Sequence, residues 1–421
     1  MKLNLVNVGK IKNADIQLNG ITVIAGENNT GKSTIGKMLF CIYNSFYKIE
    51  RQINEERQKT IMRLIMNFYH EMANRLTSRF QPINFVKHIV ENQDEYLNNE
   101  RLLFLNIREF YIQSDKYFEK YIDEDKLKQL ADKIIFYLRI DDAEIRKIIL
   151  KKRLDAEFGM KVGHLDNLDE NSRVNLEIKQ NFIQFEIIKN EDILINQFIS
   201  LFKDIIYVDD PFVLDNINKD LFWGTGIKYE HRGDLLLKLI SSETAKDFSV
   251  VDELVVDKKI SKIFEAMNEV CDGDMISVDG GFKYKSNKLN GELEISNLST
   301  GMKSFIILRK LLKDGRIDEN GVIILDEPEI HLHPEWQLKF AEIIVLIQKE
   351  FGMNILLNTH SPYFLNAIEV FANKYEIADK CNYYLTEEFE KRINVIDVTN
   401  NREKIYEKLA KPLQYLENMR Y

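Results

Sequence analysis

Cysteine is scarce in this chain of 421 residues, and the sequence has neither a long apolar run nor an excess of basic charge. The three cysteines, Cys41, Cys271 and Cys381, lie far apart, which favours neither a disulfide framework nor a metal knuckle and agrees with a reducing cytoplasm. No run approaches the roughly 20 apolar residues of a membrane span, and the alternating residues 1–7 lack the core of a signal peptide. We therefore expect a cytoplasmic protein without membrane contacts of its own.

The charge balance is acidic, with a formal net charge of −9 at pH 7, so no global field draws the chain to nucleic acid. A local basic face stays open as an alternative. Apolar residues make up 45% of the sequence and charged residues 30%, which is typical of a folded protein with a large core. The length predicts two or three domains.

Residues 26–34 match the phosphate-loop pattern G-x-x-x-x-G-K-[ST] in full, between an expected strand at 21–25 and an expected helix at 35–43. The glycines let consecutive backbone N–H groups face phosphate oxygens, and the helix N-terminus adds a partial positive charge. Lys32 neutralises phosphate charge, and the Ser33 hydroxyl is placed to ligate Mg²⁺. The loop residues expected to bind ATP are Gly26, Glu27, Asn28, Asn29, Thr30, Gly31, Lys32, Ser33 and Thr34.

A second stretch, residues 322–334, runs from four apolar residues into acids. An apolar run this short and rich in β-branched residues predicts a strand buried on both faces of a parallel sheet. Asp326 and Glu327 follow at the carboxyl end of that strand, where α/β sheets bind their ligands. Together with the phosphate loop, these acids predict a site for a nucleoside triphosphate and Mg²⁺.

The remaining segments predict an ATPase head that is interrupted by an insertion. Residues 1–44 are expected to form the N-terminal part of the head, 45–168 a helical arm or lid, and 169–421 the C-terminal part. Within the insertion, apolar residues recur at steps of three or four residues over 61–76 and 127–138, which predicts amphipathic helices.

Strand and turn signals flank the insertion on both sides. Asn19-Gly20 predicts a two-residue hairpin that joins two strands ahead of the phosphate loop. Residues 275–284 predict a second hairpin around Asp279-Gly280. Segments 383–385 and 394–396 are expected to be edge strands before a terminal helix.

Two further motifs complete the set. Residues 298–303, Leu-Ser-Thr-Gly-Met-Lys (the signature motif), would by themselves be a plain helix N-cap. Thr359-His360 ends another apolar strand after Glu327. Phosphate loop, Leu-Ser-x-Gly, acidic strand end and strand-end histidine, in this order, resemble the ATP-binding cassette (ABC) ATPases, above all the heads of SMC-type and RecF-like proteins. The resemblance implies an α/β fold, in which an ABC-type ATPase head combines a mixed sheet that carries the P-loop with an antiparallel β subdomain.

The resemblance also implies roles for particular residues. Glu327 is expected to be the general base for the attacking water, His360 to sense the γ-phosphate, and Asp326 to contact Mg²⁺. Ser299 and Gly301 are expected to reach the ATP of a second protomer, because such heads close head to tail over two nucleotides. We therefore expect a homodimer or higher oligomer held together by ATP.

Some positions depart from the ABC pattern or stay open. Thr300 replaces the usual second glycine of the signature motif and Met302 the usual glutamine. The glutamine of the Q-loop has only two weak candidates, Gln113 and Gln184.

The pair His331 and His333, close to Glu329, could suggest a metal site. The resemblance favours a different reading, a D-loop at the dimer interface.

Within the ABC class, the phosphate loop and Asp-Glu-Pro-Glu-Ile-His-Leu-His-Pro resemble the bacterial overcoming-lysogenisation-defect-like ATPases. Their relatives serve as ATPase subunits of antiphage systems such as Septu and PARIS. Many members of that family carry a C-terminal Toprim nuclease, and the roughly sixty residues after His360 are too few for one. We therefore expect a separate effector protein, a nuclease or a toxin.

The main alternative is a RecF-like ATPase of DNA repair or recombination whose insertion binds DNA directly. Basic residues gather at 48–79 and 151–153, but glutamates are interspersed in the first group, and solvated helix faces explain both groups more simply. A transporter cassette is disfavoured by the long insertion and the altered signature motif. A translation factor with tandem cassettes is disfavoured because the sequence has one phosphate loop.

Overall fold

The computed structural model divides into two compact units, residues 1–47 with 150–421 and residues 48–149, and each is described by itself. The structure describes residues 1–72, 80–114, 118, 120, 122–159, 161–163, 170–218, 229–241, 250–288 and 291–419, without the side chains of 250–255 and 412–418.

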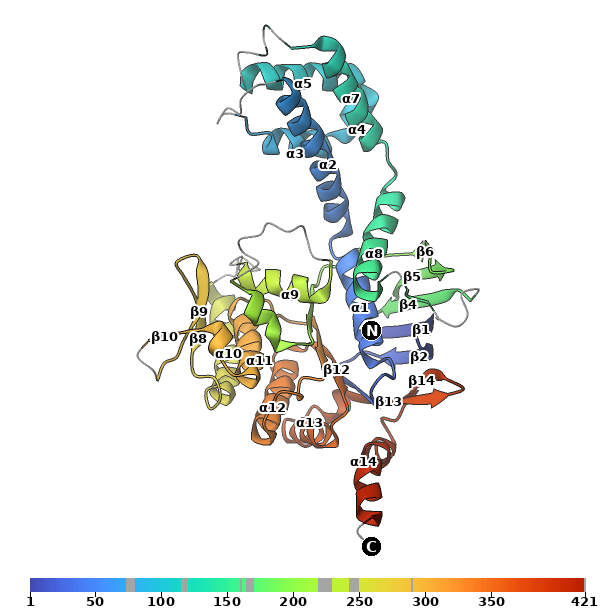
Figure 1. Cartoon of the computed structure of the whole chain (residues 1–421), viewed down its shortest axis with the longest axis vertical. Coiled ribbons are helices and arrows are strands. Elements are labelled where there is room, and N and C mark those ends of the chain that lie inside the picture. The colour runs from blue at the N-terminus through green and yellow to red at the C-terminus, as the bar shows by residue number, and fades with distance from the viewer. Residues whose placement is uncertain are drawn as a thin grey trace. The chain divides into compact units, whose positions relative to one another are not determined.

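The first unit combines helices with two β-sheets (Figure 1). Its strands are β1 (Lys2–Val8), β2 (Ile11–Gln17), β3 (Ile21–Ala25), β4 (Ser172–Ile178), β5 (Asn181–Ile188), β6 (Asp192–Gln197), β7 (Ile205–Val208), β8 (Asp274–Val278), β9 (Gly281–Lys285), β10 (Glu292–Glu294), β11 (Val322–Asp326), β12 (Asn354–Thr359), β13 (Cys381–Phe389) and β14 (Arg392–Asp397). Its helices are α1 (Lys32–Phe46), the second half of α8 (Asp142–Phe158), η1 (Pro211–Asn216), α9 (His231–Ile240), α10 (Val250–Met267), η3 (Ile295–Asn297), α11 (Thr300–Lys313), α12 (Pro334–Phe351), α13 (Pro362–Lys374), η4 (Ala378–Lys380) and α14 (Glu403–Asn418).

The larger sheet is mixed, and its strand order in the described residues is β6-β5-β4-β1-β2-β14-β13-β3-β12-β11-β7. The strands β13, β3, β12, β11 and β7 run parallel to one another, whereas β1, β2, β4, β5 and β6 form an antiparallel part. The prediction of an α/β head with a mixed sheet and an antiparallel subdomain is thereby confirmed.

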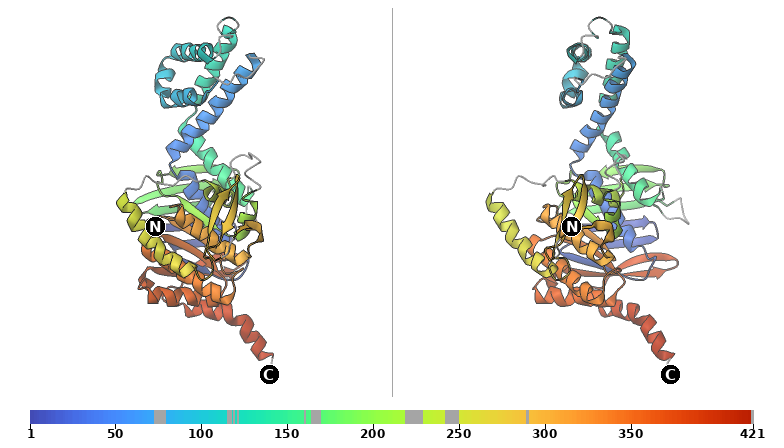
Figure 2. Two further views of the ribbon diagram at one scale, coloured as in Figure 1. Left: turned by 90° about the vertical axis from the view of Figure 1, so that its left-hand side faces the viewer. Right: turned by 60° about the vertical axis from the view of Figure 1, so that its left-hand side comes forward.

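The central parallel strands are buried on both faces because helices cover each side (Figure 2). In β11, Ile323 and Leu325 join one core with α11, α12 and α13. Val322 and Ile324 join a second core with α1 and the antiparallel strands. Alternate residues of one strand therefore fill two cores, as the unbroken apolar run predicts.

Two predictions about strand pairing are wrong. The strands on either side of Asn19-Gly20 form no hairpin, because β14 and β13 lie between β2 and β3 in the sheet. The turn at Gly20, with a φ of +68°, instead carries the chain across to β3, and the Gly20 carbonyl accepts from the Ile355 N–H. Consequently β13 and β14 are interior strands and not edge strands, whereas the predicted hairpin of β8 and β9 is confirmed.

The second unit is helical, with α2 (Ile49–Met72), α3 (Ile83–Glu91), α4 (Gln93–Asn98), α5 (Glu100–Ser114), α7 (Glu124–Leu138) and the start of α8. The apolar residues predicted to repeat along two of these helices are buried in one core, for example Ile61, Ile65, Leu127 and Ile134. Leu76, at the end of the first predicted repeat, lies outside the described residues. The amphipathic pattern therefore places these two helices correctly.

The helical unit is shorter than the predicted insertion of residues 45–168. Phe46 belongs to a core of the first unit, and so do Leu150 and Leu154 in the second half of α8. The continuous helical pattern of α8 hides this boundary, since one helix serves both units. The predicted end point at 168 lies outside the described residues. In the described part of the chain, no helix combines the length and the apolarity that a membrane span needs.

Candidate functional site

The carboxyl ends of three neighbouring parallel strands carry the polar residues of the candidate site. β3 leads into the phosphate loop, β12 ends at Thr359, and β11 ends at Asp326. The register places Thr359 opposite Ala25 and Asp326 opposite Asn358. Motifs that are some three hundred residues apart in the sequence therefore meet at one edge of the sheet.

The phosphate loop wraps around its own lysine. Lys32 is 4% exposed, and its Nζ donates to the carbonyls of Gly26 at 3.1 Å and Glu27 at 2.9 Å. The Thr30 hydroxyl also bonds the Glu27 carbonyl, at 2.8 Å. Gly26 needs to be glycine, because its φ is +154° and a Cβ there would lie 1.8 Å from the Thr386 hydroxyl oxygen.

The start of α1 suits an anion. Gly31 is its N-cap in a left-handed conformation without a side-chain cap, and the first turn contains no acidic residue. Ser33 and Thr34 lie half-buried in that turn, and Glu27, Asn28 and Asn29 are exposed at the outer side of the loop. First-turn N–H groups and the helix dipole together form a cradle for phosphate.

Asp326 is a buried carboxylate that receives only neutral hydrogen bonds. Its Oδ2 accepts from the Tyr207 hydroxyl at 2.9 Å, and its Oδ1 accepts from Asn358 Nδ2 at 2.9 Å. The carboxylate is 8% exposed and no Lys or Arg is paired with it among the described contacts. A negative charge held by neutral donors fits a divalent cation, and magnesium is typically held by one or two protein oxygens plus phosphate.

Glu327 lies between the two other predicted catalytic residues. Its Oε1 is 3.5 Å from Lys32 Nζ and 3.4 Å from His360 Nδ1. Its backbone has a φ of +50°, and its N–H donates to the Asn358 carbonyl at 2.9 Å. A left-handed backbone is strained for a residue other than glycine or asparagine, and at Glu327 the hydrogen bond to Asn358 helps to hold it.

Ser299 and Gly301 contact a different part of the chain. The Ser299 side chain caps α11 by accepting from the Met302 N–H at 3.3 Å. A Cβ on Gly301 would lie 3.0 Å from the His331 carbonyl and 3.1 Å from the Trp336 ring. The described contacts of both residues are thus within α11 and with the segment after Glu329, and not with the phosphate loop of the same chain.

The histidine pair is exposed on that segment. The His331 ring lies edge-on to Phe212 with 5.5 Å between ring centroids, and His333 is the N-cap of α12. Glu329 is 3% exposed and accepts from the Thr359 hydroxyl at 2.5 Å. Burial raises the pKa of Glu329 above its ordinary value. Among the described residues, no group of three or more His, Cys, Asp or Glu side chains is arranged to hold a metal ion.

The glutamine candidates for the Q-loop lie elsewhere. Gln113 is on α5 of the helical unit, where it donates to Glu109, and Gln184 is on β5 in the antiparallel part of the sheet. On the side of β11 opposite β12 lies β7, and two acids, Asp209 and Asp210, follow β7 in the sequence. The sequence does show this buried strand ending in acids, but its place next to β11 follows only from the sheet order.

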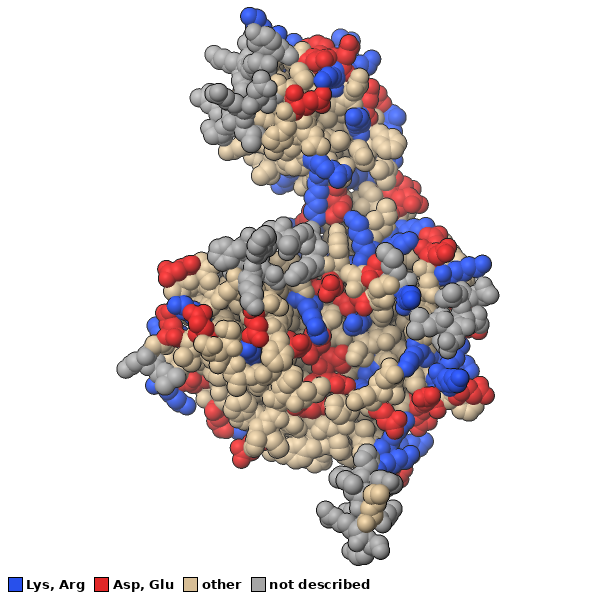
Figure 3. Space-filling view, viewed as in Figure 1, with Lys and Arg blue, Asp and Glu red and all other residues tan. Residues whose placement is uncertain are grey.

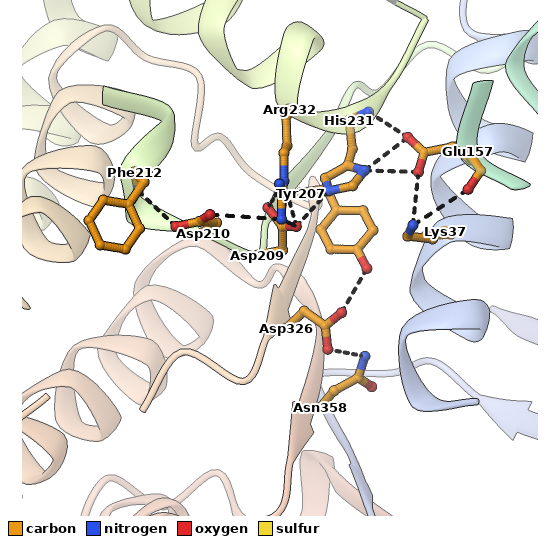
Figure 4. Close-up of polar contacts among 10 residues, drawn as sticks. All are labelled: Lys37, Glu157, Tyr207, Asp209, Asp210, Phe212, His231, Arg232, Asp326 and Asn358. Carbon is orange, nitrogen blue, oxygen red and sulfur yellow. Dashed lines mark hydrogen bonds and ion pairs between the residues drawn. The ribbon is translucent and has the colours of Figure 1, made fainter. Parts of the chain in front are cut away.

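A charged cluster that the sequence motifs do not reveal surrounds His231 (Figure 4). His231 is 6% exposed, with its Nδ1 2.9 Å from both carboxylate oxygens of Glu157 and its Nε2 3.0 Å from Asp209 Oδ2. Arg232 also pairs with Asp209, at 2.6 Å, and Lys37 lies 3.7 Å from Glu157. The residues come from α1, α8, α9 and the end of β7, so ordinary sequence patterns could not group them.

This cluster keeps His231 charged. Burial is the largest single influence and lowers the pKa of His231, but the hydrogen bonds and charges of Asp209 and Glu157 together outweigh it and raise that pKa from 6.5 to about 9. Burial likewise raises the pKa of Asp209, and the hydrogen bonds and charges of His231 and Arg232 together lower it to about 2. At neutral pH the imidazolium therefore lies between two carboxylates.

The fold and these strand-end residues define an ATPase of the ABC type. The model of the family described as "AAA domain, putative AbiEii toxin, Type IV TA system" matches residues 21–366, and the chain belongs to this family.

Individual relatives agree with that class. The chain is 38% identical over 93 residues to the Septu protein PtuA of Bacillus thuringiensis, which covers 19% of this chain and 23% of PtuA. It is 23% identical over 385 residues to the Retron Vc95 probable ATPase of Vibrio cholerae, covering 82% of this chain and 67% of that protein. The predicted resemblance to a protein of the Septu systems is confirmed, and the matched segment spans less than a quarter of the length of PtuA.

Among solved structures, the SMC head domain from Thermotoga maritima is similar over 94% of this chain and 98% of that one, with 11% identity and a TM-score of 0.39.

The pKa of His231 predicts how stability depends on pH. Because the pKa of His231 is raised from 6.5 to about 9 in the folded protein, protonated His231 stabilises the folded state. This contribution to the free energy of unfolding is complete below pH 6.5 and is lost as the pH rises through 9. The loss amounts to about 3 kcal/mol at 1.36 kcal/mol per pKa unit. In thermal unfolding from pH 6 to 9.5, the advantage of wild type over His231→Gln should shrink steadily. An advantage of wild type that stays constant over this pH range would contradict the assignment of charge to His231.

Proposed function

We propose that this ATPase binds ATP between two copies of its head and that the assembly controls a separate effector, a nuclease or a toxin, in bacterial defence against phage. The observation that carries the catalytic part is the position of Glu327, with Lys32 and His360 within 3.5 Å of its carboxylate. The effector part is supported by the relatives, one named a Septu protein and one a retron ATPase.

In the proposed reaction, Glu327 accepts a proton from water while the water oxygen bonds to the γ-phosphorus. The bond from the γ-phosphorus to its bridging oxygen breaks, which leaves ADP and phosphate. Lys32 and the first-turn N–H groups of α1 neutralise phosphate charge, and His360 orients the γ-phosphate. Mg²⁺, when bound, adds further neutralisation, and Asp326 and Ser33 are the residues that would hold it.

In the proposed assembly, a second copy supplies the signature motif that contacts the ATP bound to the first copy. Ser299 begins a helix of 14 residues whose N-terminal dipole suits phosphate, yet its described contacts are not with its own phosphate loop. A head-to-tail pair would place the signature motif of each copy on the ATP of the other. Because two nucleotides then join the copies, assembly depends on ATP and is reversed by hydrolysis.

The basic residues of the helical unit give little support to direct DNA binding, the main alternative. On α2, Arg51 pairs with Glu55 and Lys59 with Glu56, while the buried Arg57 pairs with Asp142 at 2.7 Å. Arg75 and Arg79 lie outside the described residues. On the face drawn in Figure 3, the described Lys and Arg side chains are scattered among Asp and Glu. A surface of mixed sign attracts a phosphate backbone weakly.

Two substitutions test the catalytic assignment. Lys32→Ala should abolish nucleotide binding, because the phosphate cradle loses its buried cation. Glu327→Gln should still bind ATP but lower kcat by about 10²-fold or more, since a general base contributes that much. Both are measured by phosphate release and by binding of a fluorescent ATP analogue. Glu335→Gln, an exposed acid near the same segment, is the control. Unchanged turnover in Glu327→Gln would refute the general-base role.

A matched pair of variants tests assembly through ATP. Asp and Asn cap helices equally well, so Ser299→Asp and Ser299→Asn both preserve the start of α11, while only Asp brings a negative charge to the partner's phosphates. In the Glu327→Gln background with ATP, light scattering should give twice the 49.6 kDa of one chain. Ser299→Asn should retain most of this dimer and Ser299→Asp should lose it. Equal dimerisation of the two would contradict a trans contact.

The same variants test for an effector. Glu327→Gln protein, purified from its native cells with ATP, should retain a nuclease or toxin-like protein in stoichiometric amount. The double variant with Ser299→Asp should release that protein if the effector recognises the ATP-bound pair. Recovery of the chain with DNA alone would contradict an effector and favour the RecF-like alternative.

A further inference from the structure

Tyr207 connects the His231 cluster to the strand-end acids. It is the third residue of β7, opposite Ile324 in the register, and is 1% exposed. Its hydroxyl donates to Asp326 Oδ2 at 2.9 Å, from a neighbouring strand (Figure 4).

The helix after the phosphate loop leaves room for this hydroxyl. Gly36 lies in α1, where a Cβ would be 3.1 Å from the Tyr207 hydroxyl oxygen and 3.1 Å from Ile324 Cγ2. Glycine inside a helix costs about 1 kcal/mol relative to alanine. The close approach of the phenol gives a physical reason for glycine at this position.

The rings of His231 and Phe40 also hold the ring of Tyr207 in place. The His231 ring stacks on it with 4.3 Å between centroids and an interplanar angle of 25°. The Phe40 ring meets both edge-on at 6.1 Å. Since Glu157 and Asp209 fix His231 at both ring nitrogens, the phenol has little freedom to turn.

We propose that Tyr207 is a positioning residue for the metal-binding carboxylate of Asp326, with His231 and Gly36 fixing the phenol in place. The proposal rests on the proposed function, in which Asp326 contacts Mg²⁺. The hydroxyl holds one carboxylate oxygen in a fixed orientation. A lysine or arginine in its place would neutralise the negative charge of Asp326, whereas the neutral hydroxyl does not. Asn358 holds the other oxygen, so the carboxylate is oriented before the cation arrives.

Tyr207→Phe tests the proposal, and the chain offers a matched control. Tyr384 is also 1% exposed, and its hydroxyl accepts from the Gln17 N–H at 2.8 Å, away from Asp326. Both Tyr→Phe variants remove one hydrogen bond of a buried tyrosine, and only Tyr207→Phe loosens Asp326. The readout is binding of a fluorescent, non-hydrolysable ATP analogue by the full chain as Mg²⁺ is titrated, with a parallel series in EDTA.

Tyr207→Phe should raise the Mg²⁺ concentration at half-saturation by 10-fold to 100-fold, the usual effect of removing a partner of a metal ligand, at about unchanged affinity for the metal-free nucleotide. Tyr384→Phe should leave both values unchanged. An unchanged Mg²⁺ requirement in Tyr207→Phe would overturn the positioning role. Failure of the wild type to bind the analogue at all would refute the proposed function itself.

Gly36→Ala provides a second test that leaves the tyrosine in place. Its methyl group should push the hydroxyl away from Asp326 and raise the Mg²⁺ requirement in the same direction. In the Tyr207→Phe background, the same substitution should add little, because the displaced hydroxyl is already gone. Fully additive effects would show that Gly36 acts through α1 alone and would overturn its part in the proposal.

Discussion

Burial of the central parallel strands on both faces is the constraint on which the site depends. Each of these strands sends alternate side chains into two different cores, so a shift of one residue would exchange every apolar contact. The same shift would move Asp326 by about 3.3 Å and turn its side chain to the opposite face. Packing of the two cores therefore fixes the distances between the strand ends. The polar residues at those ends are brought together by this packing and need few contacts among themselves.

Two adjacent acids at the end of β11 have opposite surroundings. Asp326 is buried and receives hydrogen bonds from a phenol and an amide, which leave its charge uncompensated. Glu327 is more exposed and lies within 3.5 Å of a lysine and a histidine. β11 ends at Asp326, and Glu327 has a left-handed backbone, so the regular alternation of strand side chains stops between the two acids. One carboxylate is thereby suited to a cation and the other to a proton.

The sequence was sufficient for whatever depends on local pattern. Some features could be predicted because each depends on the residue spacing within a single helix, strand or loop. These features are the phosphate loop, the buried strand before Asp326 and the helical repeats near Ile61 and Leu127. Pairing between distant strands is not local, and so Asn19-Gly20 was misread as a hairpin although β13 and β14 separate its strands. The boundary inside α8 was missed for a related reason, since an unbroken helix carries no signal where one core ends and another begins.

The cluster around His231 was beyond sequence analysis because its members share no spacing, but its chemistry is determined once they meet. A neutral imidazole donates from one nitrogen only, whereas both ring nitrogens of His231 face carboxylates, those of Glu157 and Asp209. A neutral imidazole would point the lone pair of one ring nitrogen at a carboxylate about 3 Å away, and this contact is repulsive. Charge on His231 therefore fixes the orientation of the ring, and the ring fixes Tyr207 by stacking. Through Tyr207, His231 thus limits the motion of the carboxylate that would hold the metal.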